Sequence, residues 1–106
     1  MIIDHRTYTF HPLKMAKWLK LYQEKGLPVQ YKYLGQPLAM YRTEVGTLNQ
    51  VVTLWQLKDM GEFQSSRAEL AKDPEWQAFL VEVEALNALL HQENKFISPI
   101  DLPPRS

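Results

Sequence analysis

The order in which strand-like and helix-like patterns follow one another constrains the fold of this chain more than any other feature. Residues 2–10 are rich in β-branched and aromatic side chains, which is typical of a strand. A pattern of apolar residues three and four positions apart then starts at Met15 and lasts until Gly26 or Pro28. The first third of the chain therefore predicts a strand followed by an amphipathic helix.

Two more strand patterns occupy the middle of the chain. They cover residues 36–45 and 49–57, and the second is the strongest β signal in the sequence. Gly46 lies between them, and Asn49 follows it as a further turn residue. Two strands joined by a short glycine-containing loop predict a β-hairpin.

The last part of the chain predicts a second helical region and a final strand. The helix begins at Met60 and pauses at Asp73, which precedes a proline and so has the features of a helix N-cap. The restarted helix carries an apolar stripe: Trp76, Phe79, Leu80, Val83, Leu86 and Leu90. A short strand over residues 93–98 and an irregular, proline-containing tail over residues 99–106 complete the prediction.

The resulting order, β-α-β-β-α-β, predicts an α+β ferredoxin-like fold with a four-stranded antiparallel sheet. Both helical regions would cover the same face of that sheet. The opposite face would leave Val, Leu, Trp or Tyr side chains in water, and an exposed apolar face of this size usually marks an interface. We therefore expect a homodimer whose protomers pack sheet against sheet.

Composition sets limits on what this single domain does. The chain has 106 residues and no cysteine, which excludes disulfide scaffolds, thiol nucleophiles and thiolate metal sites. Twelve basic and twelve acidic residues cancel, and this argues against a nucleic-acid partner bound through its phosphates. Neither a signal peptide nor an apolar run long enough to span a bilayer is evident, so we expect a cytoplasmic protein without membrane insertion.

Several motifs identify a resemblance to a known family. They are Arg6-Thr7-Tyr8 in the first strand, Thr43-Glu44-Val45-Gly46-Thr47-Leu48-Asn49-Gln50-Val51-Val52 across the hairpin, Leu54-Trp55, Arg67-Ala68 and Asp73-Pro74-Glu75-Trp76. In these motifs and their spacing the chain, residues 1–106, resembles the NIPSNAP family of the dimeric α/β-barrel superfamily. It departs from the family at Thr53, where many members have a histidine before the Leu-Trp pair.

The resemblance implies an architecture more than a reaction. Two protomers would form a barrel with a central space, in agreement with the exposed-face argument. Eukaryotic members of the family resemble adaptor or trafficking-associated proteins, whereas the wider superfamily includes cofactor-independent monooxygenases, dehydratases, isomerases and haem-degrading enzymes. A fold shared by such different proteins does not choose among their activities.

Arg6, Tyr8 and Glu44 are the candidate catalytic residues. Arg6 and Tyr8 lie two apart on a strand, so their side chains point to the same face, together with Asp4. A buried guanidinium beside a phenol can hold a carboxylate or enolate and supply a proton. The alternative is structural, with Arg6 paired to Asp4 or Glu44. Glu44 is either a general base or the partner of an arginine.

Arg67, Trp55 and Trp76 are the candidate ligand-binding residues. An arginine within an apolar helical stripe must find an anion or extend to solvent, and Arg67 occupies such a position. Trp55 and Trp76 occupy the positions of the family motifs, and both also suit the core.

No metal or cofactor site is predicted from the sequence. His5, His11 and His91 lack metal-ligand spacing, and no phosphate-binding loop or dinucleotide fingerprint is present. Two functions stay open. One is a small-molecule-binding protein or cofactor-independent enzyme acting on an aromatic or keto/enol compound, and the other is a non-catalytic interaction or ligand-sensing module. A cavity that contains Arg6 or Arg67 with unpaired donors would favour the first.

Overall fold

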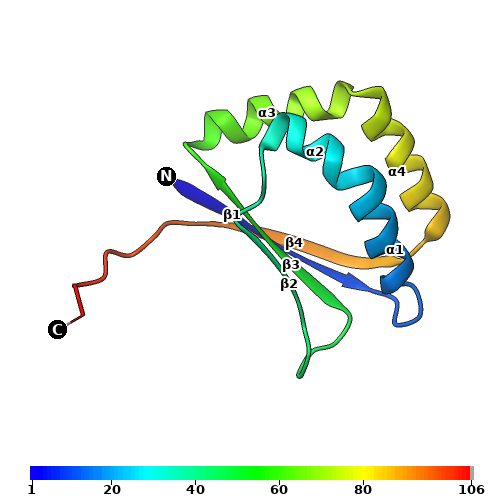
Figure 1. The fold of residues 1–106 in the computed structure, drawn as a ribbon, viewed down its shortest axis with the longest axis horizontal. Coiled ribbons are helices and arrows are strands. Elements are labelled where there is room, and N and C mark those ends of the chain that lie inside the picture. Colours follow the sequence, from blue (N-terminus) through cyan, green and yellow to red (C-terminus); the bar gives the residue numbers. More distant parts are fainter. Residues whose placement is uncertain (106) are drawn as a thin grey trace.

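All helices of the protein pack on one face of a four-stranded antiparallel sheet in the computed structural model, which describes residues 1–105 (Figure 1). The strands are β1 (Ile2–Phe10), β2 (Ala39–Arg42), β3 (Gln50–Leu57) and β4 (Leu89–Ile97), in the spatial order β2-β3-β1-β4. β1 therefore lies at the centre of the sheet, between β3 and β4. The α+β ferredoxin-like fold predicted from the order of patterns is confirmed.

The first helical region is longer than predicted. It comprises α1 (Met15–Leu21), the π-helical turn η1 (Tyr22–Gly26) and α2 (Leu27–Leu34), so it does not end at Gly26 or Pro28. In η1 the backbone N–H of Leu27 donates to the carbonyl of Tyr22, five residues earlier. Pro28 then falls in the first turn of α2, where a missing N–H costs little, and the helical path continues.

The second helical region has the predicted interruption. α3 (Met60–Lys72) and α4 (Pro74–Leu86) meet at Asp73, whose carboxylate accepts hydrogen bonds from the backbone N–H groups of Glu75 and Trp76 at 2.7 and 3.3 Å. These bonds satisfy two of the donors that a helix start leaves without partners, which explains why α4 begins at this point.

Two strands differ from the prediction in length. β4 begins at Leu89 rather than at residue 93, so Leu90 belongs to a strand and not to the helical stripe. Asn87, in the left-handed conformation at φ 51°, ends α4, and β4 then pairs with β1 along most of its length. β2 is shorter than the predicted 36–45, because from residue 43 the chain enters the loop to β3.

The two faces of the sheet have different surroundings. Asp4, Arg6, Tyr8 and Phe10 of β1 point toward the helices, and the core formed there contains Phe10, Trp18, Tyr22, Val51, Phe79 and Ala88. The intervening residues of β1, from Ile3 to Thr9, point to the other face, which no helix covers (Figure 1). The sheet is therefore half covered, as the order of elements predicts.

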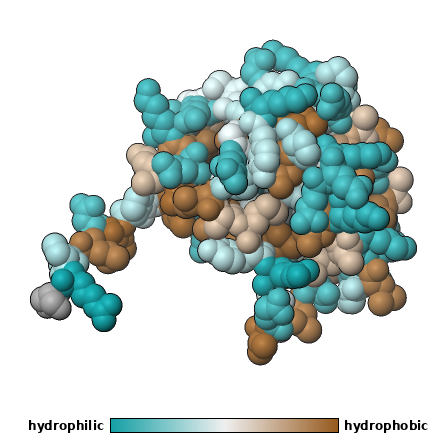
Figure 2. Space-filling view, in the orientation of Figure 1, coloured by the Kyte–Doolittle hydropathy of each residue, from teal (hydrophilic) through white to brown (hydrophobic). Residues whose placement is uncertain are grey.

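Apolar side chains are exposed on two projecting segments. Figure 2 shows them at the tip of the β2–β3 hairpin and along the tail, where Val45 and Ile100 are almost fully exposed. The tail has no helix or strand over residues 99–105, and its last residue, 106, lies outside the described part of the chain. Within residues 1–105 no helix has the length and apolar character needed to cross a membrane.

Candidate functional site

A buried carboxylate with two arginines forms the charged centre beneath the helices. The Asp4 side chain is fully buried, and its Oδ2 lies 2.8 Å from Arg6 Nη1 and 3.7 Å from Arg67 Nη2. Its other oxygen, Oδ1, accepts a hydrogen bond from Asn94 Nδ2 at 3.1 Å. One carboxylate thus faces two guanidinium groups, so the cluster carries one excess positive charge.

Arg67 is the less satisfied of the two arginines. Its Nε is buried and has no hydrogen-bond partner among the described residues. Its guanidinium also lies 5.8 Å from the centre of the Phe63 ring, which allows a cation–π contact. Burial lowers the pKa of Arg67, and the nearby charge of Arg6 lowers this pKa further. A guanidinium nevertheless stays protonated in proteins, so Arg67 carries its charge without a full set of acceptors.

Arg6 is better satisfied. Burial lowers its pKa, but the neighbouring Tyr8 and Asp4 more than offset that effect, so the pKa of Arg6 is raised overall. Its Nε donates to the Tyr8 hydroxyl at 3.0 Å. Because this hydroxyl oxygen accepts from Arg6, its own hydrogen remains available to donate to a ligand.

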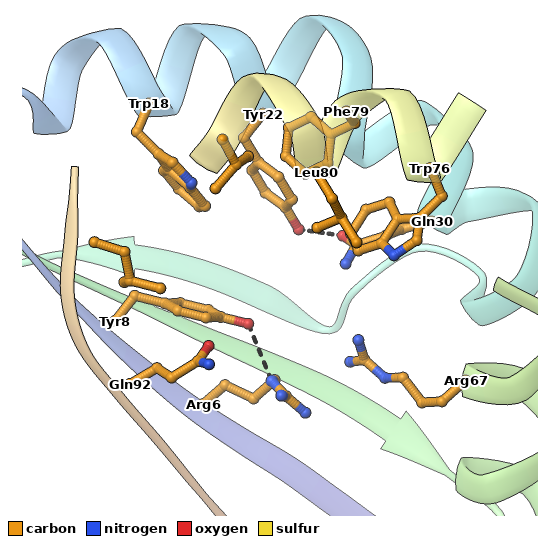
Figure 3. A pocket seen from close by; sticks show the side chains of 12 residues that line it. Arg6, Tyr8, Trp18, Tyr22, Gln30, Arg67, Trp76, Phe79, Leu80 and Gln92 are labelled. Carbon is orange, nitrogen blue, oxygen red and sulfur yellow. Dashed lines mark hydrogen bonds between the residues drawn. The ribbon is translucent and has the colours of Figure 1, made fainter. Parts of the chain in front are cut away.

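A cavity of about 170 Å³ lies directly above these residues, between the sheet and the helices (Figure 3). Its floor on the sheet is polar and its walls are mostly aromatic. Trp18 stacks on Tyr22 with ring centres 4.8 Å apart, and Trp76 lies 5.1 Å from Phe79. The lining residues are Arg6, Tyr8, Trp18, Tyr22, Gln30, Arg67, Trp76, Phe79, Leu80, Val83, Leu89 and Gln92.

The cavity brings together most of the residues singled out in the sequence, but not all. Arg6, Tyr8, Arg67 and Trp76 line it. Glu44 does not: it lies in the exposed loop after β2, where its Oε1 is 3.8 Å from Arg42 Nε. An arginine partner was one of the two roles expected for Glu44, and the partner is on the surface because the short β2 ends before residue 43.

Trp55 is also absent from the cavity lining. It is buried on the helix-facing side of β3, and its indole N–H donates to the Thr53 hydroxyl at 3.2 Å. Thr53 is itself buried and pairs in register with Arg6. The position where many family members have a histidine is therefore on the same face of the sheet as the charged cluster.

Eight lining residues were not assigned to a site from the sequence, and the four among them that carry polar atoms are Trp18, Tyr22, Gln30 and Gln92. Trp18 and Tyr22 were visible only as members of an apolar helical stripe. Gln30 lies beyond the predicted end of that helix, and Gln92 precedes the predicted start of the last strand. Both amides reach the cavity because the helix and the strand are longer than their local patterns indicate.

Tyr22 and Gln30 form a buried polar pair on the helical side of the cavity. The Tyr22 hydroxyl donates to Gln30 Oε1 (Figure 3). Burial raises the pKa of Tyr22 well above its ordinary value, so the phenol stays protonated at neutral pH. The carbonyl side of the Gln30 amide is thereby occupied.

Metal ligands are not grouped in this site. Across residues 1–105, no three histidine or acidic side chains lie close enough together to hold a metal ion. His5 belongs to the uncovered face of the sheet, opposite Arg6 and Tyr8.

Comparison with known proteins places the chain in a family. The model of the NIPSNAP family matches residues 3–104, which is nearly the whole sequence. The chain belongs to the NIPSNAP family. It is similar to an uncharacterized NIPSNAP domain protein from Burkholderia xenovorans, with 34% identity, a TM-score of 0.88, and coverage of 99% of this chain and 100% of the other.

A second NIPSNAP structure supports the same assignment. A NIPSNAP family protein from Agrobacterium tumefaciens has 31% identity and a TM-score of 0.89, with 97% of this chain and 96% of the other covered. No protein with a curated description matches the chain.

Likeness beyond the NIPSNAP family is confined to the fold. A putative antibiotic biosynthesis monooxygenase from Deinococcus radiodurans shares the ferredoxin-like arrangement at a TM-score of 0.66 but only 11% identity, with 100% of this chain and 99% of the other covered. At this identity the likeness carries no statement about activity.

Proposed function

We propose that this NIPSNAP protein binds one small planar organic anion, a carboxylate or an enolate, in the cavity between its sheet and its helices. The observation that carries the proposal is that the buried Nε of Arg67 has no acceptor. Arg67 belongs to a cluster that carries one excess positive charge. Burying a charge without enough acceptors costs free energy, and an anionic ligand that accepted from the exposed part of the Arg67 guanidinium would offset part of that cost.

The walls of the cavity favour a ring as the rest of the ligand. Trp18, Tyr22, Trp76 and Phe79 present aromatic surfaces around a space of about 170 Å³. An apolar protein cavity of about 150 Å³ is sufficient to bind benzene. The cavity therefore fits a single ring with one or two small substituents.

The polar floor offers chemistry as well as binding. An oxygen of the ligand would accept from Arg67, and the free hydrogen of the Tyr8 hydroxyl would point to the same ligand. If Tyr8 gave its proton to an enolate oxygen, the resulting phenolate would be stabilised by the Arg6 Nε–H donor at 3.0 Å. This arrangement suits a cofactor-independent enzyme that acts on aromatic or keto/enol compounds.

We further propose that two copies pair through the uncovered face of the sheet. That face contains Ile3, Val52, Leu54, Tyr41 and Ile97, whose register positions alternate with those of the helix-facing residues. Tyr41 is 63% exposed, although it is a large aromatic residue in a strand. Burial of these side chains against a second copy would supply the apolar surface that a small domain lacks.

Calorimetric titration with benzoate tests the binding proposal. Benzamide has nearly the same shape without the charge, so it should bind at least tenfold more weakly. Because charge-assisted hydrogen bonds contribute about 1.5–3 kcal/mol, Arg67→Met should weaken benzoate binding roughly tenfold to a hundredfold. The matched control is Arg42→Met, which removes an exposed arginine from β2 and should leave binding unchanged. Equal binding of benzoate by the wild type and Arg67→Met would contradict the proposal.

Sedimentation equilibrium tests the homodimer. The wild type should sediment as a dimer, and Leu54→Asp on the uncovered face should convert it to a monomer. Val81→Asp places the same charge on an exposed position of α4 and should leave the dimer intact. A monomeric wild type at micromolar concentration would rule out the sheet-to-sheet pairing.

A further inference from the structure

Gln30 is a buried amide that the binding of an anion alone does not explain. It lies on α2 with only 4% of its surface exposed, and it lines the cavity. Its carbonyl oxygen accepts from the Tyr22 hydroxyl, whereas its amide nitrogen donates no hydrogen bond among the described residues. Figure 3 shows this nitrogen pointing into the cavity, toward the space above Arg67. Because Arg67 Nε is the one buried side-chain donor without a partner among the described residues, the Gln30 nitrogen is not enclosed by protein and is open to the cavity, where it can donate to a ligand.

The π turn of the first helical region is what brings Gln30 to this position. Tyr22 and Gln30 are eight residues apart, and in a regular α-helix such residues would diverge by about 80° around the axis. The wider turn η1 (Tyr22–Gly26) absorbs one extra residue, so both side chains lie on one face. Gly26 makes this turn possible against α4, because a Cβ there would lie 2.7 Å from Phe79 Cζ. Single π turns are frequent at functional sites.

The cavity therefore has hydrogen-bond donors on its sheet side and on its helical side. Tyr8 lies on the sheet side of the cavity and Arg67 enters from α3, whereas Gln30 lies on the helical side, above Arg67 in Figure 3. Aromatic rings, which offer no strong acceptor, form much of the remaining lining. A ligand that satisfied both sides would carry its anionic group at one end of a ring and a neutral oxygen at the other.

We infer that Gln30 is a specificity-determining residue whose amide N–H donates to a hydroxyl or keto oxygen on the ligand, remote from its anionic group. This inference rests on the proposed function, because it assigns a substrate class to the same cavity. The class is a single-ring carboxylate or enolate that bears an oxygen at the meta or para position. A substituent at the ortho position would remain beside the arginines and would not reach α2.

The experiment compares benzoate with its three monohydroxy derivatives by calorimetric titration of the full chain. The meta or para isomer should bind roughly five- to tenfold more tightly than benzoate, which is the usual effect of one hydrogen bond. The ortho isomer should gain nothing. Gln30→Met should abolish the preference while changing benzoate affinity by less than about threefold.

Two further variants distinguish a loss of the hydrogen bond to the ligand from a general loss of folding. Gln30→Met leaves the buried Tyr22 hydroxyl without its acceptor and so threatens folding, whereas the double variant Tyr22→Phe with Gln30→Met removes both partners and should be tolerated. This double variant should also lose the preference. Gln64→Met is the matched control: it removes an exposed amide from α3, outside the cavity lining, and should keep the preference.

Each outcome separates the two proposals. If the wild type binds neither benzoate nor its derivatives, the proposed function itself fails. If benzoate binds through Arg67 but no isomer is preferred, the proposed function stands and the role of Gln30 is refuted. A preference that survives in the double variant refutes that role as well.

Discussion

Replacement of Arg67 by methionine should stabilise the ligand-free protein, although Arg67 is a partly buried member of an ion cluster. Methionine has a similar length and no polar donor, so Arg67→Met removes the buried Nε that has no partner. An unsatisfied buried donor costs about 1–3 kcal/mol. The substitution also removes the unfavourable proximity of the Arg6 and Arg67 charges, which contributes to the lowered pKa of Arg67.

The stabilising contacts that Arg67→Met removes are weaker than the penalties that it relieves. The contact between Arg67 Nη2 and Asp4 is long, at 3.7 Å, and the arginine side chain is 23% exposed, so solvent weakens the pair. The cation–π contact with Phe63, at 5.8 Å, contributes about 0.5–1 kcal/mol. Arg67→Met should therefore raise the free energy of unfolding by about 1 kcal/mol, which corresponds to a rise in Tm of about 4 °C for a domain of this size.

Arg6→Met provides the contrast within the same cluster. Arg6 holds the fully buried Asp4 carboxylate at 2.8 Å, and without Arg6 that carboxylate would keep only Asn94 and the distant Arg67. Removing one partner of a buried pair costs about 3–5 kcal/mol, and the partial exposure of Arg6 places the expected loss near the lower end. The two arginine substitutions should therefore shift stability in opposite directions.

Urea unfolding at equal protein concentrations, followed by tryptophan fluorescence, measures both effects. The midpoint should move to higher urea for Arg67→Met and to lower urea for Arg6→Met, with similar slopes. If Arg67→Met lowered the free energy of unfolding by about 1 kcal/mol or more, Arg67 would be a structural member of the cluster. The inference that the ligand-free site lacks an anion would then be wrong.

Two further predictions concern the helices. The Tyr33 hydroxyl and the backbone donors of α4 lower the pKa of Asp73, so the stability that it provides is present above its ordinary pKa of 3.8 and is lost as the pH falls through the lowered value. Asp73→Asn, which retains a capping residue, should flatten this decline in acid unfolding curves; an unchanged curve would exclude the charge as the cause. Gly26→Ala should lower stability by about 1–3 kcal/mol in urea unfolding despite the higher helix propensity of alanine, because the new Cβ would overlap Phe79 and Tyr22. A gain in stability would show that this packing is loose.

Local patterns were sufficient to predict most of the elements and their order. The β-branched residues of β1 and β3, and the Asp73-Pro74 start of α4, each define their own secondary structure through side chains that are close in sequence. The one-sided cover of the sheet follows from that order. Arg6 and Tyr8 were predicted to share a face because strand residues two apart always do.

The first and last residues of the helices and strands were predicted less well, because contacts between residues far apart in the sequence decide where an element ends. β4 reaches back to Leu89 because it pairs there with Phe10 of β1, 79 residues away in the sequence. The first helical region passes through Pro28 because a π turn places the proline at the start of a new segment. Glu44 was grouped with Arg6, but β2 ends early at the sheet edge and leaves Glu44 in the loop.

The sequence by itself determined the ferredoxin-like order, the shared face of Arg6 and Tyr8, and the presence of an arginine within an apolar helical stripe. Only the tertiary structure decided that Arg67 shares Asp4 with Arg6 and that its Nε lacks an acceptor. It alone placed Gln30 in the lining of the same cavity. The physical reason is that periodicity reports which face a side chain occupies, whereas hydrogen-bond satisfaction depends on which faces the whole chain brings together.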